Sequence, residues 1–146
     1  MATEPADSRR TAWDALVRAQ ALVLPQVHRV LRGSHGLSLS EFIVLKCIGA
    51  TGTATMTELQ EQASLSAAGI TRVVSGLVAQ GMVLRTRGEQ DLRLWHAQVT
   101  PAGRRRLSAA SATLDQELGR LFGGQHNEDE LAVAARVLQN LCNAVP

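Results

Sequence analysis

The stretch that decides the fold is MTELQEQASLSAAGITRVVSGLVAQG, residues 56–81. Thr55 and Glu58 have the spacing of a capping box, which predicts a short helix directly after Thr55. Ser66 is a suitable N-cap for a second helix, which is expected to end near Gly81. The apolar face of that second helix consists of Ile70, Val73, Val74 and Leu77. Two short helices joined by about three residues predict a helix-turn-helix.

A β-hairpin and two more helices are predicted after this motif. Residues 82–87 and 92–99 are expected to form the two arms, with a polar tip at residues 88–91. Thr100 followed by Pro101 predicts a helix start, because proline is favoured at the first helical position. This helix is expected to extend to Gly123 and Gly124, and Asn127 is expected to cap a last helix.

A long helix is predicted near the N-terminus. Apolar residues recur at helical spacing from Trp13 to Leu31. Pro25 is expected to kink or break this helix, and Gly33 is expected to end it. The apolar stripe is wider than one neighbouring helix requires, which indicates contact with a second chain.

A second capping box precedes the helix-turn-helix. Ser38 and Glu41 have the required spacing and open an apolar helix that includes residues 42–48. Residues 49–55 are rich in small and hydroxyl side chains and are expected to form a loop.

Composition excludes several classes of protein. The chain has 146 residues, 45% hydrophobic and 19% charged, which fits one globular domain rather than a disordered or fibrous protein. Its apolar runs are far shorter than the ~18 to 20 residues of a membrane span. Residues 1–10 are polar and lack the apolar core of a secretory signal, so a cytoplasmic protein is expected. Cys47 and Cys142 lack metal-type spacing and are expected to be reduced thiols.

Positive charge is concentrated in one part of the chain. Residues 72–106 contain seven arginines and only two acids, Glu89 and Asp91. This basic stretch predicts an anion-binding surface, with nucleic acid as the first partner to consider. For Arg104, Arg105 and Arg106 a solvated surface is an equal alternative.

The order of the predicted elements is typical of a winged helix-turn-helix, a mainly α fold with a small β-wing, here flanked by helices at both ends. Residues 38–103 resemble the MarR family of bacterial transcription regulators. The motifs that carry this resemblance are Leu39-Ser40-Glu41-Phe42 with Val44-Leu45, Met56-Thr57-Glu58-Leu59, Leu65-Ser66, Gly69-Ile70-Thr71-Arg72-Val73-Val74, Leu77, Gly81-Met82-Val83, Asp91-Leu92-Arg93 and Val99-Thr100-Pro101-Ala102-Gly103.

The resemblance implies a homodimer that binds double-stranded DNA. Residues 1–35 would be an N-terminal arm and dimerisation helix, 36–100 the winged DNA-binding domain, and 101–146 the C-terminal dimerisation helices. Two recognition helices would enter successive major grooves of a pseudo-palindromic operator, ~34 Å apart. Many family members bind small, often aromatic and anionic effectors. The implied function is therefore a transcriptional repressor released by such a ligand.

A set of residues is expected to contact DNA. Arg72, on the outer side of the recognition helix, is the best candidate for a phosphate or guanine contact. At the wing the resemblance implies that Asp91 braces Arg93, which would enter the minor groove, and that Arg85 and Arg87 lie near phosphates. The full set is Ser66, Ala67, Ala68, Thr71, Arg72, Ser75, Arg85, Arg87, Asp91 and Arg93.

Three places depart from the family pattern. Ala67 and Ala68 stand where other members often have polar or larger residues, so direct base readout is expected to be thin, although alanine can contact a thymine methyl group. Gly76 lies inside a helix, where glycine is less favourable than alanine by about 1 kcal/mol. Trp95 and its two C-terminal neighbours replace small aliphatic residues of the return strand, so the wing is expected to pack differently.

A ligand cleft is expected between the dimerisation helices and the winged module, with Arg18 or His28 fixing an acid group. The alternative is that Trp13 and Phe42 are core residues and that Arg18 is solvated. The residues that could line the cleft are Trp13, Val17, Arg18, His28, Leu37 and Phe42.

Other kinds of site are not expected. The four histidines are scattered and none has a partner at ligand spacing within a secure helix, so neither a metal nor a cofactor is predicted. Cys47 is expected to pack in the core rather than to sense oxidants. No phosphate-binding glycine loop or nucleophile–base spacing indicates an enzyme. Ala67 and Ala68, at the start of the recognition helix, offer no polar side chain for base contacts. This leaves one alternative open, a winged-helix interaction protein without sequence-specific DNA binding.

Overall fold

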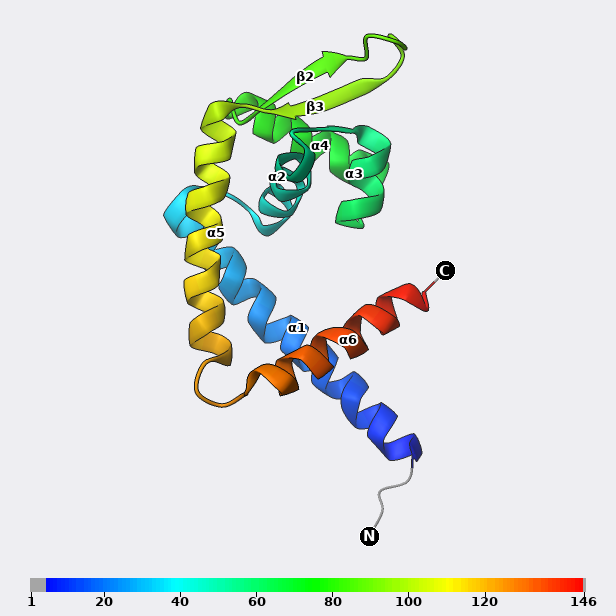
Figure 1. Cartoon of the computed structure of the whole chain (residues 1–146), viewed down its shortest axis with the longest axis vertical. Helices are drawn as coiled ribbons and strands as arrows, with labels where there is room; N and C mark the ends of the chain where they lie inside the picture. The colour runs from blue at the N-terminus through cyan, green and yellow to red at the C-terminus, as the bar shows by residue number, and fades with distance from the viewer. Residues whose placement is uncertain (1–4, 146) are drawn as a thin grey trace. The chain divides into compact units, whose positions relative to one another are not determined.

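The computed structural model describes residues 5–145, with side chains from residue 8 onward (Figure 1). Contacts divide the chain into two compact units, residues 1–114 and 115–146. The predicted division at residues 35 and 100 stays a prediction. In chain order the elements are α1 (Pro5–His35), α2 (Leu39–Thr51), β1 (Thr53–Thr55), α3 (Met56–Ala63), α4 (Ala67–Ala79), β2 (Val83–Arg87), β3 (Trp95–Val99), α5 (Pro101–Phe122) and α6 (Glu128–Asn143).

Helices α2 and α3 begin at the two predicted capping boxes. Ser38 Oγ accepts a hydrogen bond from the Glu41 amide at 3.1 Å, and the Glu41 carboxylate accepts one from the Ser38 amide at 2.7 Å. Thr55 and Glu58 repeat the arrangement at 3.2 and 2.7 Å. Each box satisfies two amides that a helix start would otherwise leave unpaired. Both predicted helix starts are therefore confirmed.

The helix-turn-helix is confirmed as well. Residues 64–66 separate α3 from α4, and Ser64 adopts a left-handed conformation with φ +52° that ends α3. Ser66 then caps α4, because its Oγ accepts a hydrogen bond from the Gly69 amide at 3.1 Å. The sequence therefore places both helices and their connection correctly.

Helix α1 differs from its prediction at both ends. It begins by Pro5 and continues through Gly33 to His35, so the expected end at Gly33 is wrong. Gly36 ends the helix instead, because its φ of +68° suits glycine and its amide still donates to the Arg32 carbonyl at 3.0 Å. Pro25 lies inside a continuous helix, so the break that was one of two expectations does not occur.

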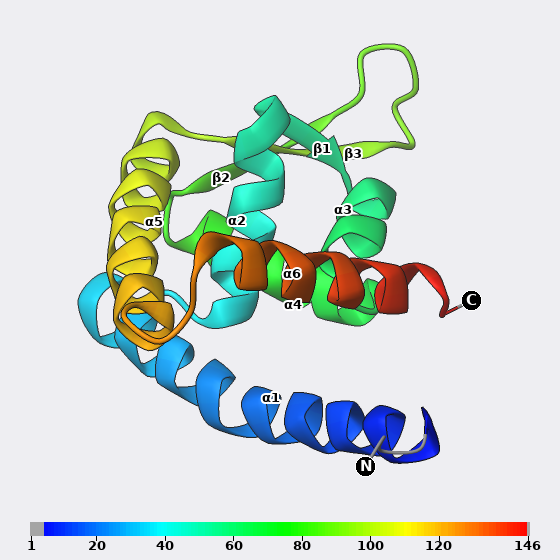
Figure 2. The same cartoon turned by 60° about the horizontal axis from the view of Figure 1, so that its bottom comes forward.

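The expected loop over residues 49–55 is also wrong. Helix α2 continues to Thr51, Gly52 ends it with φ +84°, and residues 53–55 form strand β1. The three strands are antiparallel in the order β1-β3-β2, and they lie side by side in Figure 2. Strand β3 supplies hydrogen-bond partners for residues 53–55, and Ala54 lies buried opposite Ala97. The wing is therefore anchored in a three-stranded sheet.

The core of the first unit lies between α2, α3, α4, the sheet, the end of α1 and the start of α5. Helix α5 approaches the chain after α4 so closely that a Cβ atom at Gly103 would overlap the Met82 carbonyl. Thr100 fixes this start, since its Oγ accepts from the Gly103 amide at 3.0 Å and donates to the Gly81 carbonyl at 2.8 Å. The largest fully buried side chains are Leu31, Leu37, Leu45, Ile48, Leu59, Ile70 and Leu77.

The second unit holds the end of α5 and the whole of α6. Gly124, with φ +84°, follows the end of α5, and Asn127 and Glu130 form a third capping box at the start of α6. None of the residues of α6 is buried. Its exposed apolar side chains include Val133, Val137, Leu138 and Leu141. None of the helices within residues 5–145 combines the length and apolarity needed to cross a membrane.

Candidate nucleic-acid interface

Helix α4 separates its apolar and polar residues onto two faces. Ile70, Val74 and Leu77 are fully buried, and α4 packs against both α2 and α3. The opposite face is exposed and carries no acid in its first turn, so the positive end of the helix dipole is not offset there. The residues exposed around this face are Ser66, Ala67, Ala68, Thr71, Arg72 and Ser75.

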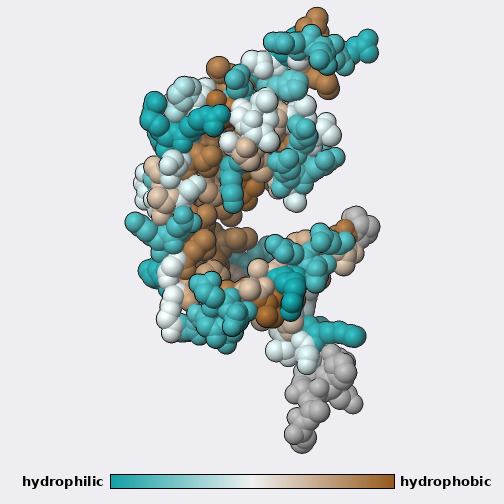
Figure 3. Space-filling model, viewed as in Figure 1, coloured by the Kyte–Doolittle hydropathy of each residue, from teal (hydrophilic) through white to brown (hydrophobic). Residues whose placement is uncertain are grey.

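The hairpin β2–β3 projects from the rest of the first unit as a wing (Figure 1). Arg85 and Arg87 are exposed on β2, and Asp91 and Arg93 are exposed in the tip loop. Figure 3 shows hydrophilic and hydrophobic residues side by side along this projection. The wing therefore presents cations together with uncovered apolar surface.

Hydrogen bonds within the loop fix the wing tip. Asp91 Oδ1 accepts from the Arg93 backbone amide at 2.9 Å, and the Leu94 amide donates to the Asp91 carbonyl at 3.1 Å. The Gly88 amide donates to the Leu94 carbonyl at 2.9 Å. Asp91 thus contacts Arg93 through the main chain. That Asp91 braces Arg93 for entry into the minor groove stays a prediction.

Sequence reasoning missed an aromatic contact at the base of the wing tip. The guanidinium carbons of Arg85 and Arg87 lie over the Trp95 ring, 5.1 and 4.9 Å from its centroid. The expected unusual packing of the wing at Trp95 therefore takes the form of two cation–π contacts. The contact follows from the hairpin register, which pairs Arg87 with Trp95 and places Arg85 on the same face, and the sequence alone did not define that register.

A model of the MarR family matches residues 37–94, which include the recognition helix, its supporting helices and most of the wing. Over these residues, which make up less than half of the chain, the protein is similar to the MarR family. The chain is 25% identical over 135 residues to YhjH of Bacillus subtilis, an uncharacterised HTH-type transcriptional regulator, and the match covers 88% of this chain and 75% of that protein.

The fold of the chain is similar to those of solved transcription regulators. For BldR of Sulfolobus solfataricus the TM-score is 0.84 at 22% identity, with 94% of this chain and 99% of that chain covered. For BpsR of Bordetella bronchiseptica, described with a mechanism by which 6-hydroxynicotinic acid regulates its DNA binding, the TM-score is 0.79 at 20% identity. That match covers 90% of this chain and 98% of the BpsR chain.

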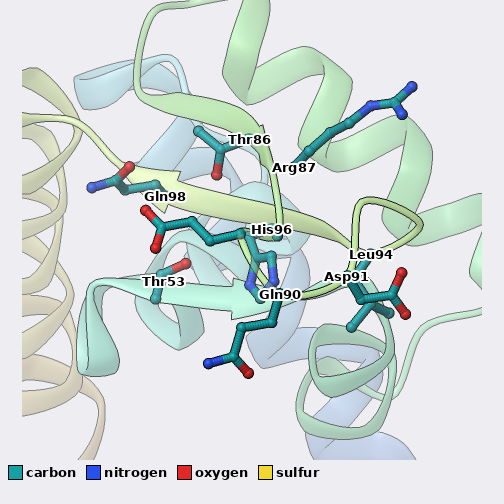
Figure 4. A pocket seen from close by; sticks show the side chains of 10 residues that line it. Thr53, Thr86, Arg87, Gln90, Asp91, Leu94, His96 and Gln98 are labelled. Carbon is teal, nitrogen blue, oxygen red and sulfur yellow. The ribbon is translucent and has the colours of Figure 1, made fainter.

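A groove lies along the wing beside the tip loop. Its volume is about 660 Å³, and polar side chains from β1, β2, β3 and the tip loop line most of it. Figure 4 shows the Arg87 side chain extending away from His96 and Gln98. The two faces of the wing are therefore chemically different. The labelled lining residues are Thr53, Thr86, Arg87, Gln90, Asp91, Leu94, His96 and Gln98.

The residues expected to line a ligand cleft are only partly brought together. Val17 and His28 line a groove of about 580 Å³ between α1 and the start of α2. Leu37 and Phe42 are buried core residues, which is the alternative that the sequence left open for Phe42. Trp13 is 57% exposed, and neither it nor Arg18 lines that groove. Sequence reasoning missed the other lining residues, Gln20, Ala21, Leu24, Pro25, Leu39 and Ser40.

Glu41, on α2, connects this helix to α1 and to the end of α4. In addition to its role in the capping box, its carboxylate accepts from Gln80 Nε2 at 3.0 Å and lies 3.5 Å from Arg32 Nη1. A Cβ atom at Gly76 would lie 3.3 Å from Glu41 Oε1, so glycine inside α4 leaves room for this carboxylate. Glu41 thereby links the C-terminal end of α4 to both α1 and α2.

Arg106 and the two cysteines are the remaining candidate functional residues. Arg106 donates a hydrogen bond to the His35 carbonyl, which ties α5 to the end of α1. Burial raises the pKa of the half-buried Cys47 thiol, whereas Cys142 is exposed on α6. Within residues 5–145, no group of three or more His, Cys, Asp or Glu side chains is arranged to hold a metal ion.

Proposed function

We propose that this protein is a homodimeric MarR-family regulator that binds a pseudo-palindromic operator and represses transcription until a small aromatic, anionic ligand releases it. The observation that carries the DNA-binding part is the exposed polar face of α4, which stands free of acids in its first turn. A recognition helix of this kind fits the major groove, and Arg72 on it provides a donor for phosphate or guanine. Arg93 in the exposed tip loop is proposed to enter the adjacent minor groove.

Exposed apolar side chains support the homodimer. Leu22 is 63% exposed on α1, and Val137 is 56% exposed on α6. Apolar residues that gather on one side of a helix without cover are typical of an interaction surface. A second copy of the chain would cover both sets and would place two recognition helices about one DNA turn, ~34 Å, apart.

The groove between α1 and α2 supports the effector. Its lining combines apolar side chains such as Val17 and Leu24 with His28, whose imidazole could pair with an acid group. His28 Nδ1 also lies 3.4 Å from the Leu39 amide, so a ligand there would act on the residues that begin α2. BpsR, similar in fold, is regulated by an aromatic acid, 6-hydroxynicotinic acid. A ligand that binds better to a dimer of altered spacing would lower operator affinity.

The first experiment is selection of bound duplexes from a random DNA pool. The winning duplex is then titrated against scrambled DNA at two salt concentrations. We expect a palindromic winner preferred by ~10³-fold or more, as is typical of specific binders. Weak, uniform binding that disappears with added salt would instead support an interaction protein whose basic surface binds any DNA.

Two further measurements test the role of the wing and the proposed repression. Arg93→Ala is expected to weaken operator binding without a change in dimer mass, whereas Arg136→Ala, an exposed arginine on α6, serves as the matched control. Unchanged affinity of Arg93→Ala would remove the wing from the mechanism. A promoter reporter that carries the selected operator should fall in expression when the protein is supplied and recover on addition of 6-hydroxynicotinic acid as an aromatic-acid probe. Activation by the protein alone would overturn the repressor assignment.

A further inference from the structure

Trp95 is an exposed aromatic residue with an ordered cationic environment. It lies on β3, and its relative exposure is 39%. The guanidinium carbons of Arg85 and Arg87 lie 5.1 and 4.9 Å from the centroid of its ring. Both distances are within the ~6 Å over which the negative face of an aromatic ring attracts a cation.

The strand register explains why these three side chains meet. Arg87 is paired directly with Trp95 across the β2–β3 ladder. Arg85 lies two residues before Arg87 on β2, so it points to the same face of the hairpin. Arg87 Nη1 also lies 3.4 Å from the Leu92 carbonyl, to which it donates. Both arginines are therefore held above one ring rather than free to sample many rotamers.

Preorganised cations bind phosphates more efficiently than mobile ones. An arginine loses side-chain freedom when it binds a phosphate, and this loss is smaller when the guanidinium is already confined. Two neighbouring guanidiniums also repel each other, and the shared indole face offsets part of that repulsion. The exposed edges of both groups keep their hydrogen-bond donors available to an anion.

We propose that Trp95 is a positioning residue for DNA binding, whose indole ring holds Arg85 and Arg87 as a preorganised pair of cations for the DNA backbone. This inference rests on the proposed DNA-binding function. Because phosphates carry no sequence information, the effect of Trp95 applies to duplexes of any sequence. Trp95 thereby sets affinity rather than operator choice.

A mixed-sequence, 30-base-pair duplex labelled with fluorescein is the probe, and anisotropy titrations over several salt concentrations give affinity and salt slope. Trp95→Ala is expected to weaken binding roughly fivefold, because both cation–π contacts are lost. Trp95→Phe keeps an aromatic face and should weaken binding about twofold or less. Leu84→Ala removes another exposed apolar residue of the wing and should leave affinity unchanged.

A double-mutant cycle separates positioning from direct contact. Arg85→Ala with Arg87→Ala should reduce the salt slope by about two for each wing, one for each phosphate contact. In that background Trp95→Ala should have no further effect, since the ring has no cation left to hold. A full fivefold loss in both backgrounds would mean that Trp95 contacts DNA by itself, and it would overturn the inference.

Tryptophan quenching tests the arrangement without DNA. In a Trp13→Phe variant Trp95 is the only indole, because the chain has two tryptophans. Anionic iodide should quench this indole more strongly than cationic caesium, and the preference should fall when both arginines are replaced by alanine. Equal quenching before and after replacement would overturn the inference even if Trp95→Ala were misfolded. Absence of any duplex binding by the wild-type protein would overturn the proposed function, while the quenching result would still decide the Trp95–arginine contact.

Discussion

The helices of the winged module and helix α6 begin in the same way but differ in what covers them. Ser38 with Glu41, Thr55 with Glu58, and Asn127 with Glu130 are all complete capping boxes. Helices α2 and α4 nevertheless bury most of their large apolar residues, whereas α6 buries none. Local sequence therefore specifies where each helix begins, and tertiary partners decide which helices are stabilised by packing. Helix α6 therefore has a start as well defined as those of the core helices, but its apolar face is exposed.

The largest effect is expected when the apolar face of α6 is charged. Val137→Asp with Leu141→Asp would place two carboxylates in the proposed dimer interface, where unpaired charges are strongly unfavourable. We expect the dimer dissociation constant to rise by about 1,000-fold, equivalent to about 4 kcal/mol, with the winged module still folded. Sedimentation velocity and circular dichroism measure the two properties. Gln139→Asp, on the opposite side of α6, is the matched control, and a double variant that stays dimeric would refute this role of α6.

The next largest effect is the difference in stability between replacing a buried and an exposed leucine of the winged module. Leu45 is fully buried in α2, so Leu45→Ala is expected to lower the free energy of unfolding by about 2–5 kcal/mol. Leu84 is 54% exposed on β2, and Leu84→Ala should change it by less than about 0.5 kcal/mol. Urea unfolding followed by circular dichroism gives both values. Similar losses for the two variants would show that burial in the structure does not report the stabilising contacts.

A smaller effect is expected when the capping box is removed from α3 or from α6. Thr55→Ala and Asn127→Ala each remove the side-chain acceptor of a capping box, which typically costs about 1 kcal/mol. For Thr55 the loss should appear in global unfolding, because α3 is packed against the core. For Asn127 it should appear as faster amide hydrogen exchange at the start of α6, with little change in global stability. Equal global losses would mean that α6 unfolds together with the winged module.

The smallest effect is a pH dependence at the α3 cap. Hydrogen bonds from the Thr55 amide and hydroxyl hold the pKa of Glu58 below its ordinary value of 4.5. A group whose pKa is lower in the folded state stabilises it above the unfolded pKa, and this contribution is lost as pH falls through the folded pKa. Glu58→Gln should therefore reduce the loss of stability below about pH 4.5. Urea midpoints from pH 6 to 3 measure it, with Glu61→Gln, an exposed acid outside the box, as control.

Much of the fold could be predicted because its signals are local. A capping box needs only four residues, so the starts of α2, α3 and α6 follow directly from the sequence. The three-residue strand β1 could not be found in this way, because Thr53–Thr55 becomes a strand only through its pairing with distant β3. The end of α1 at Gly36 rather than Gly33 depends on backbone conformation, and both positions are glycine.

The candidate site could be predicted only in part for a related reason. Arg72 and the outer residues of α4 follow from helical periodicity, which fixes the exposed face once the buried one is known. The contact of Trp95 with Arg85 and Arg87 depends on the exact register of the hairpin, which the imperfect alternation of the return arm did not define. Gly76 violates helix propensity in sequence terms, and only the position of Glu41 explains it.

The two cysteines differ in exposure, so the chain can be labelled selectively at one of them. Thiolate is the species that reacts with maleimides, and burial raises the pKa of the Cys47 thiol, so little of it is reactive at neutral pH. Cys142 is exposed near the end of α6. A nitroxide spin label would therefore attach at one position in each copy without any engineered cysteine. In the proposed homodimer, pulsed dipolar spectroscopy of that label would report the separation of the two α6 helices, with and without DNA or effector, in the native sequence.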